Sequence, residues 1–237
     1  GRMKHTVKLF TIGMKQIAKD GMLAVMVPAP FLIGLFFKFA IPFINSILVR
    51  EFSFSLIPWY GLVDGMLICL APMFAAMISA FLLLEERDEG IHAYYQITPA
   101  EGYSYLFARI GLPMIGAFLI TMVVAAFFNI SSLSAAVILA SALVSSFTGI
   151  FLAMMVVSLA GNRVEGLAAS KLMGISFAGL ILIWFLPAPY YYVVSFLPSF
   201  WVGKLMTDGA EISSLLFGLL TCLLWITFFT RKFLKKV

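Results

Sequence analysis

The feature that most constrains this chain is the recurrence of apolar runs long enough to cross a lipid bilayer. A helix needs roughly 20 apolar residues to cross the hydrocarbon core, and such runs follow one another along almost the whole sequence. Only 11% of the residues are charged, against about a quarter in a typical soluble protein. The chain is therefore predicted to be an all-α, polytopic membrane protein in which residues 1–237 form a single transmembrane domain.

Six transmembrane spans are predicted. We expect Met3 to be the initiator and the first run to be a retained span, not a cleaved signal peptide. Small residues recur at four-residue spacing in the fourth span, including Ser145 and Gly149, and predict close helix packing. The six spans are placed at Met22–Leu48, Pro58–Leu84, Leu106–Phe128, Leu133–Ala160, Leu172–Leu186 and Ile212–Thr230.

Lysine and arginine are distributed unevenly between the two sides of the predicted membrane. Five precede the first span, two lie in each of the loops 85–109 and 161–171, and four lie in the tail, which makes 13 of 16 on one side. Because cytoplasmic loops carry an excess of these residues, both termini and both loops are predicted to be cytoplasmic. The net charge of +5 reflects this bias and is weak evidence for a nucleic-acid partner.

Two segments outside the spans have patterns of their own. Residues 4–20 place four lysines on one side of a helix and apolar residues on another, although Leu9 and Ile12 break the pattern. This predicts a helix in the membrane interface; a positively charged arm without defined structure is the alternative. Residues 187–210 are rich in aromatic residues and prolines, which predicts either a re-entrant outer hairpin or an extracellular loop with an aromatic belt.

The stretch Leu84–Pro99, LEERDEGIHAYYQITP, holds five consecutive charged residues after a long apolar run. Acidic residues suit the first turn of a short helix, and Ile91, Tyr94 and Tyr95 would give that helix an apolar side. An acidic segment opposes the positive bias of a cytoplasmic loop, so we expect it to contact a protein partner and not lipid. The alternative, a solvated acidic turn, explains the acids but not the tyrosines.

Two charges, Lys38 and Asp64, fall within predicted spans, both in the outer half of the membrane. An unpaired charge at the centre of a span costs about 2.5–3.5 kcal/mol. We expect the two side chains to form an ion pair between adjacent helices, or to face the translocation path. Extension of the side chains to the lipid headgroups is the remaining alternative.

Motifs for catalysis and for phosphate or metal binding are missing from the sequence. There is no G-x-x-x-x-G-K-[ST] phosphate loop, no G-x-S-x-G elbow and no H-E-x-x-H helix. The two cysteines lie apart within apolar runs, and the two histidines are isolated, so no metal site is expected. A transport subunit without enzymatic activity is predicted, with energy supplied by a partner or an ion gradient.

Three motifs carry a resemblance to a known family. Glu85–Ile91 followed by Ile97–Pro99 resembles the loop after the second span of type-2 ABC exporter permeases, where Glu-Arg-x-x-Gly and a later Thr/Ser-Pro bracket a coupling helix. Gly161–Ala168 resembles the Asn-Lys-Val-Glu-Gly-Leu-Ala segment of the small, fluoroquinolone-type export branch, and Leu197–Trp201 its Leu-Pro-Pro-Tyr-Trp. The departures are Arg163 for Lys, Ser199 for Pro and Phe200 for Tyr.

The resemblance implies that two copies of this chain pair with two ATPase subunits, which hold ATP and Mg²⁺, and that this chain binds no cofactor. It implies a multi-pass protein of the bacterial cell (inner) membrane that contacts lipid and exports amphipathic or hydrophobic compounds. Related permeases export peptide toxins and lantibiotic or bacitracin-type peptides, so the exported compound could be either a peptide or a drug. The residues expected to couple to the ATPase are Glu85, Glu86, Arg87, Asp88, Glu89, Gly90, Ile91, Tyr94, Tyr95, Arg163 and Glu165.

A proton-coupled secondary carrier that uses Lys38 and Asp64 is the alternative function. Such a carrier has no need for the acidic loop, and many carriers contain an internal repeat. No internal repeat is found in the sequence.

Overall fold

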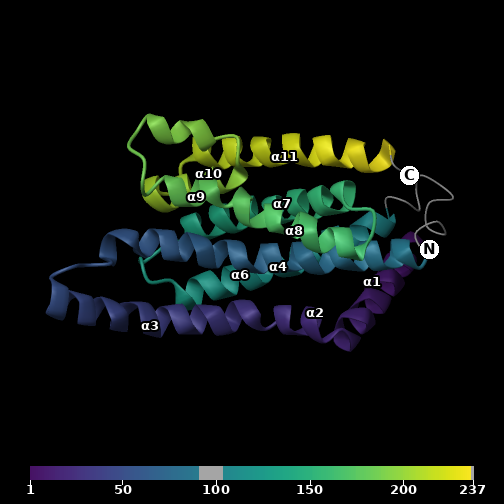
Figure 1. Cartoon of the computed structure of the whole chain (residues 1–237), viewed down its shortest axis with the longest axis horizontal. Helices are drawn as coiled ribbons and strands as arrows, with labels where there is room; N and C mark the ends of the chain where they lie inside the picture. Colours follow the sequence, from purple (N-terminus) through teal and green to yellow (C-terminus); the bar gives the residue numbers. More distant parts are fainter. Residues whose placement is uncertain (91–103, 236–237) are drawn as a thin grey trace.

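The computed structural model describes residues 1–90 and 104–235. Within these residues, six helices are long and apolar enough to cross a membrane, as predicted. Helix α1 and the last turn of α11 lie at the same end of the helical bundle (Figure 1). The six candidate spans are Ala29–Phe52, Ile57–Asp88, Ser104–Phe128, Ala135–Leu159, Arg163–Leu182 and Ile212–Lys235.

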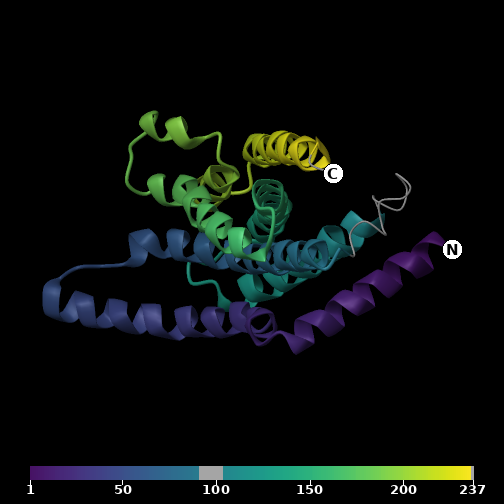
Figure 2. The same cartoon turned by 45° about the vertical axis from the view of Figure 1, so that its right-hand side comes forward.

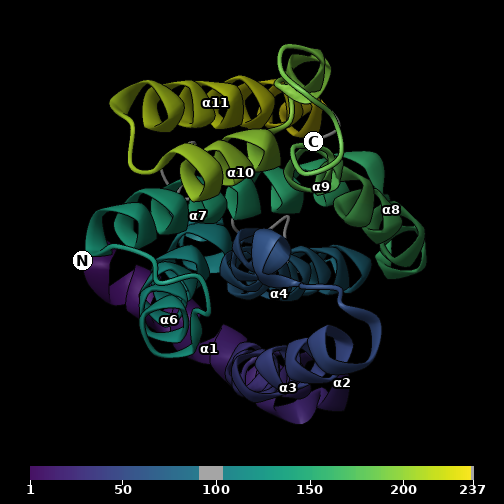
Figure 3. The ribbon, with the colours of Figure 1, turned by 90° about the vertical axis from the view of Figure 1, so that its left-hand side faces the viewer.

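Helices α4 (Tyr60–Asp88) and α7 (Ala135–Leu159) form the centre of the bundle. Around them lie α3 (Ala29–Phe52), α6 (Leu112–Phe128), α8 (Arg163–Ser176) and α11 (Ile212–Lys235) (Figure 3). A Cβ added to Gly149 of α7 would lie 2.9 Å from the carbonyl oxygen of Pro72 in α4. The small residue therefore lets these two helices approach closely, as its spacing predicted.

Helix α1 (Arg2–Lys19) crosses the end of the bundle obliquely and leads into the short α2 (Gly21–Met26) (Figure 2). Leu9, which breaks the predicted pattern, is buried together with Gly13 and Ile17, while Val7 and Met14 are exposed. The reason is that the apolar side of α1 is wide, so that one part of it packs against the bundle while the other part stays exposed. Its position in the membrane interface stays a prediction.

The fifth predicted span was placed too late in the sequence. Helix α8 begins at Arg163 and is continued by α9 (Ala178–Leu182), so most of the predicted loop 161–171 is helical. The start is set by a reciprocal cap: the Asn162 side chain accepts from the Glu165 N–H at 2.9 Å, and Glu165 accepts from the Gly161 N–H at 2.6 Å. This is a variant of the capping box with asparagine at the N-cap, in which Glu165 bonds the residue before the N-cap and not the N-cap itself.

Residues 187–210 contain the 3-10 helix η4 (Tyr190–Val194) and the helix α10 (Pro198–Asp208). With 11 residues, α10 is too short to cross a membrane, yet it is largely buried against α7, α9 and α11. Its Lys204 pairs with Asp208 and lies 5.2 Å from the ring centre of Tyr191. The predicted re-entrant segment is thus a buried short helix; its entry from the outer side of the membrane stays a prediction.

Candidate functional site

The charged block begins inside a transmembrane helix and not in a loop. Helix α4 runs to Asp88, after which Gly90 adopts a positive φ of 73°. The four residues Glu85–Asp88, called here the charged end of α4, make the contacts described below. Glu89 and Gly90 are exposed, and Ile91, Tyr94 and Tyr95 lie outside the described residues.

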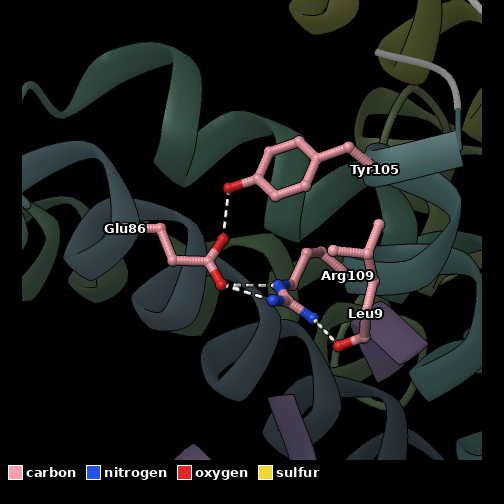
Figure 4. A network of polar contacts seen from close by, with 4 residues as sticks. All are labelled: Leu9, Glu86, Tyr105 and Arg109. Atoms are coloured by element: carbon pink, nitrogen blue, oxygen red, sulfur yellow. Dashed lines mark hydrogen bonds and ion pairs between the residues drawn. The ribbon is translucent and has the colours of Figure 1, made fainter. Parts of the chain in front are cut away.

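Glu86 points into the bundle, where it forms a buried network with Arg109 and Tyr105 (Figure 4). Arg109 donates from Nε and Nη2 to Glu86 Oε1 at 2.8 and 2.5 Å, and the Tyr105 hydroxyl donates to Glu86 Oε2. Arg109 also donates from Nη1 to the Leu9 carbonyl of α1 at 2.5 Å. The network therefore ties α4 to α1 and to the segment that leads into α6.

The two charges of this network are almost completely removed from solvent. The side chains of Glu86 and Arg109 are 1% and 2% exposed. Removing one partner of such a buried pair typically costs about 3–5 kcal/mol, because the other charge is left without compensation. Arg109 lies in η3 (Phe107–Gly111), a π-helical stretch ahead of α6, and π-helical turns within helices are frequent at functional sites.

Arg87 points in another direction and binds the end of α7. It donates to the carbonyl oxygens of Ala160 at 2.9 Å and Val157 at 3.4 Å, and its guanidinium lies 5.2 Å from the ring centre of Phe233 in α11. The last carbonyls of a helix lack intrahelical partners and carry a partial negative charge, which favours a cation there. Arg87 thus joins α4 to α7 and α11.

Glu85 and Asp88 face the start of α8. Arg163 pairs with Glu85 at 3.6 Å and with Asp20, at the junction of α1 and α2, at 2.5 Å. Asp88 accepts a hydrogen bond from the Arg163 backbone N–H at 3.1 Å. These groups are partly exposed, so each pair contributes less than the buried pair does. Glu165 caps its own helix, and its predicted contact with an ATPase stays a prediction.

The buried network was not anticipated from the sequence. Arg109 was counted with a cytoplasmic loop although it falls inside the predicted third span, and Tyr105 and Leu9 were given no role. A charge inside a span is by default a sign of a functional or structural site. That signal was available, but the spacing of 23 residues between Glu86 and Arg109 gave no reason to pair them.

Lys38 and Asp64 have separate partners in place of the predicted ion pair. Lys38 Nζ donates to the Phe127 carbonyl at 2.6 Å, in the last turn of α6. Asp64 accepts from the backbone N–H groups of Ile130 and Ser131 at 2.9 and 2.8 Å, and from the Ser131 hydroxyl. The physical reason is that the last turn of α6 offers free carbonyls to the cation, and the connection that follows it offers free N–H groups to the anion.

Within residues 1–90 and 104–235, no group of three His, Cys, Asp or Glu side chains is arranged to hold a metal ion. The contacts of the charged end of α4 attach it to its neighbours: ion pairs, hydrogen bonds and one cation–π contact join it to η3, α7, α8 and α11, and through Arg109 to α1.

Comparison with known proteins identifies the family. The chain is 26% identical over 197 residues to fluoroquinolones export permease proteins Rv2686c and MT2760, from two strains of Mycobacterium tuberculosis, which covers 78% of this chain and 75% of each relative. No solved structure matches the chain significantly. The family model described as fluoroquinolones export permease protein Rv2686c-like matches residues 13–230. The chain, a multi-pass membrane protein of six candidate spans, thus belongs to the Rv2686c-like family of export permeases.

Proposed function

We propose that this chain is the membrane subunit of an ATP-driven ABC exporter, in which two copies pair with two separate ATPase chains that bind ATP and Mg²⁺. The exported compounds are amphipathic or hydrophobic, and the relatives, named as fluoroquinolones export permeases, favour a drug over a peptide. The membrane is that of a bacterial cell, with both termini in the cytoplasm. The observation that carries the proposal is the charged end of α4, which attaches one helix end to five other elements.

These attachments would allow α4 to act as a rigid lever. Four consecutive residues, Glu85–Asp88, hold α4 to its neighbours immediately before residues 91–103, where the coupling contact with the ATPase is proposed. Because the Glu86 pair is buried and hydrogen-bonded, a push at this point moves α1, η3 and α4 together. Glu86 and Arg87 then act within the chain, while Glu89 stays available at the surface for the partner.

Helix α4 also reaches the opposite side of the bundle. Asp64 and Glu86 are separated by 22 positions in one helix, which corresponds to about 33 Å at 1.5 Å per residue. At its far end, Asp64 holds the connection between α6 and α7. We infer that α4 carries motion from the ATPase side to this connection. We also infer that Lys38 and Asp64 together hold the connection between α6 and α7 in place until α4 moves.

The alternative function, a proton-coupled carrier, requires Asp64 to release and rebind a proton during transport. Its carboxyl group accepts hydrogen bonds from two backbone N–H groups and one hydroxyl, and a protonated carboxyl group retains acceptor capacity. The ATPase experiment below therefore separates the two functions.

The proposal is tested by co-purification of the chain with a phosphate-loop ATPase encoded next to its gene. We expect the pair to bind, and ATP hydrolysis to rise when a transported compound is added. Glu89→Lys should abolish binding, because Glu89 is exposed beside the proposed contact. Glu211→Lys, an equivalent reversal ahead of α11, is the matched control and should bind normally. Transport by the chain without any ATPase contradicts the proposal.

A further inference from the structure

A cavity lies between α1, α4, α6 and the junction of α2 with α3, beside the buried network. Its volume is about 230 Å³. Its lining is apolar except for Arg109, which is the one charged side chain among the lining residues. Helices α1, α4 and α6 contribute in turn Phe10 and Ile17, Phe74 and Ile78, and Gly116 and Ile120.

The charge balance of the wall determines which compounds suit the cavity. Arg109 is neutralised by Glu86, so a carboxylate in the cavity would introduce an uncompensated negative charge into an apolar site. A guanidinium has five N–H donors, and Arg109 donates three hydrogen bonds to Glu86 and Leu9. The remaining donors suit a neutral acceptor such as a carbonyl or amide oxygen.

The cavity is partly open, so its volume limits the part of an occupant that it can enclose. An apolar cavity of about 150 Å³ is large enough for benzene, so about 230 Å³ corresponds to a body of about two rings. A helix of a partner protein is far larger than this. A lipid acyl chain is the competing occupant. Its ester carbonyl is also a neutral acceptor for Arg109, so the measurement of bound phospholipid described below distinguishes the two.

We propose that this cavity binds the uncharged, two-ring apolar part of a compound dissolved in the membrane, with a neutral acceptor oxygen of that compound on Arg109. The inference rests on the proposed export function, which it deepens by giving the transported compound a binding site. Because Arg109 also holds Glu86 and the Leu9 carbonyl of α1 (Figure 4), a bound compound contacts the network that ends at the proposed ATPase contact.

Benzophenone is a direct probe of this site, since it has two rings, a neutral carbonyl and photochemistry that labels neighbouring C–H groups. The full-length chain in nanodiscs is irradiated with increasing benzophenone, and labelled peptides are mapped by mass spectrometry. We expect saturable labelling of α4 near Phe74 and of α6 near Ile120. Excess 4-phenylbenzamide should suppress it, whereas 4-phenylbenzoate, of the same shape but anionic, should not; the opposite ranking overturns the inference.

A variant that fills the cavity provides the second test. A Cβ added to Gly116 meets no heavy atom within 4 Å, so Gly116→Phe can occupy the cavity without a clash at its first atom. Gly174 in α8 is equally open and lies outside the cavity, and Gly174→Phe is the matched control. We expect Gly116→Phe to lower the affinity for benzophenone, and with it the saturable labelling, roughly tenfold or more, because its ring occupies the cavity. A tenfold loss of affinity corresponds to about 1.4 kcal/mol. The control should leave the labelling unchanged.

Three results overturn the inference: equal labelling of the two variants, labelling that never saturates, or a phospholipid retained in native mass spectra by the unaltered chain and lost from Gly116→Phe. The assay contains no ATPase, so its outcome is separate from that of the export experiment. Saturable labelling without ATPase binding would keep the site and reject the proposed export mechanism.

Discussion

Replacing Arg109 with methionine is expected to destabilise the protein by about 3–5 kcal/mol, because the buried carboxylate of Glu86 loses its cation. Glu86 receives two hydrogen bonds from Arg109, at 2.8 and 2.5 Å, and with 1% exposure it has no access to water as a replacement. The Leu9 carbonyl also loses its donor, which weakens the attachment of α1 by about 1 kcal/mol. Arg50 and Glu51 form an exposed pair, so Arg50→Met should cost less than about 1 kcal/mol.

The free energies of unfolding can be compared by titrating the purified chain in mixed micelles with sodium dodecyl sulfate and following tryptophan fluorescence. The double variant Glu86→Leu with Arg109→Met should recover most of the loss, because no buried charge remains. A double-mutant cycle should then give a coupling energy of about 3 kcal/mol. If Arg109→Met costs no more than Arg50→Met, or if the two single effects simply add in the double variant, the pair does not stabilise the fold as argued.

Three further substitutions test other contacts. Gly13→Val should detach α1 and speed its proteolysis, because a Cβ there lies 2.8 Å from Arg109 Nη1; an unchanged cleavage rate contradicts the close approach. Asp64→Asn should open the connection between α6 and α7, so that a cysteine at the partly buried Leu133 reacts several-fold faster with a maleimide than in the parent; equal rates would show that Asp64 does not hold this connection. Gly149→Val should lower the thermal midpoint of unfolding by several degrees, as overpacking costs about 1–3 kcal/mol.

The number of spans was predictable because hydropathy depends only on composition along the chain, and it detected all six. The fifth was misplaced because the polar start of α8 looks like a loop until its cap is recognised: Asn162 and Glu165 have the spacing of a capping box. The partners of Glu86 and Asp64 were not predictable, since they lie 23 and 66 positions away. Hydropathy and local spacing contain no information on which neighbouring helix a charged side chain will face.

Helix geometry explains why the side chains of the charged end of α4 contact different neighbours. Successive side chains on a helix point about 100° apart, so four consecutive charges cannot form one docking face. Glu85 accordingly faces α8, Glu86 faces η3 and α1, Arg87 faces α7, and Asp88 returns to α8. The ends of neighbouring helices surround this end of α4, so each of the four charged side chains has a partner on its own side. The first four residues of this block, Glu85–Asp88, therefore hold the ends of neighbouring helices together, and their contact with an ATPase stays a prediction.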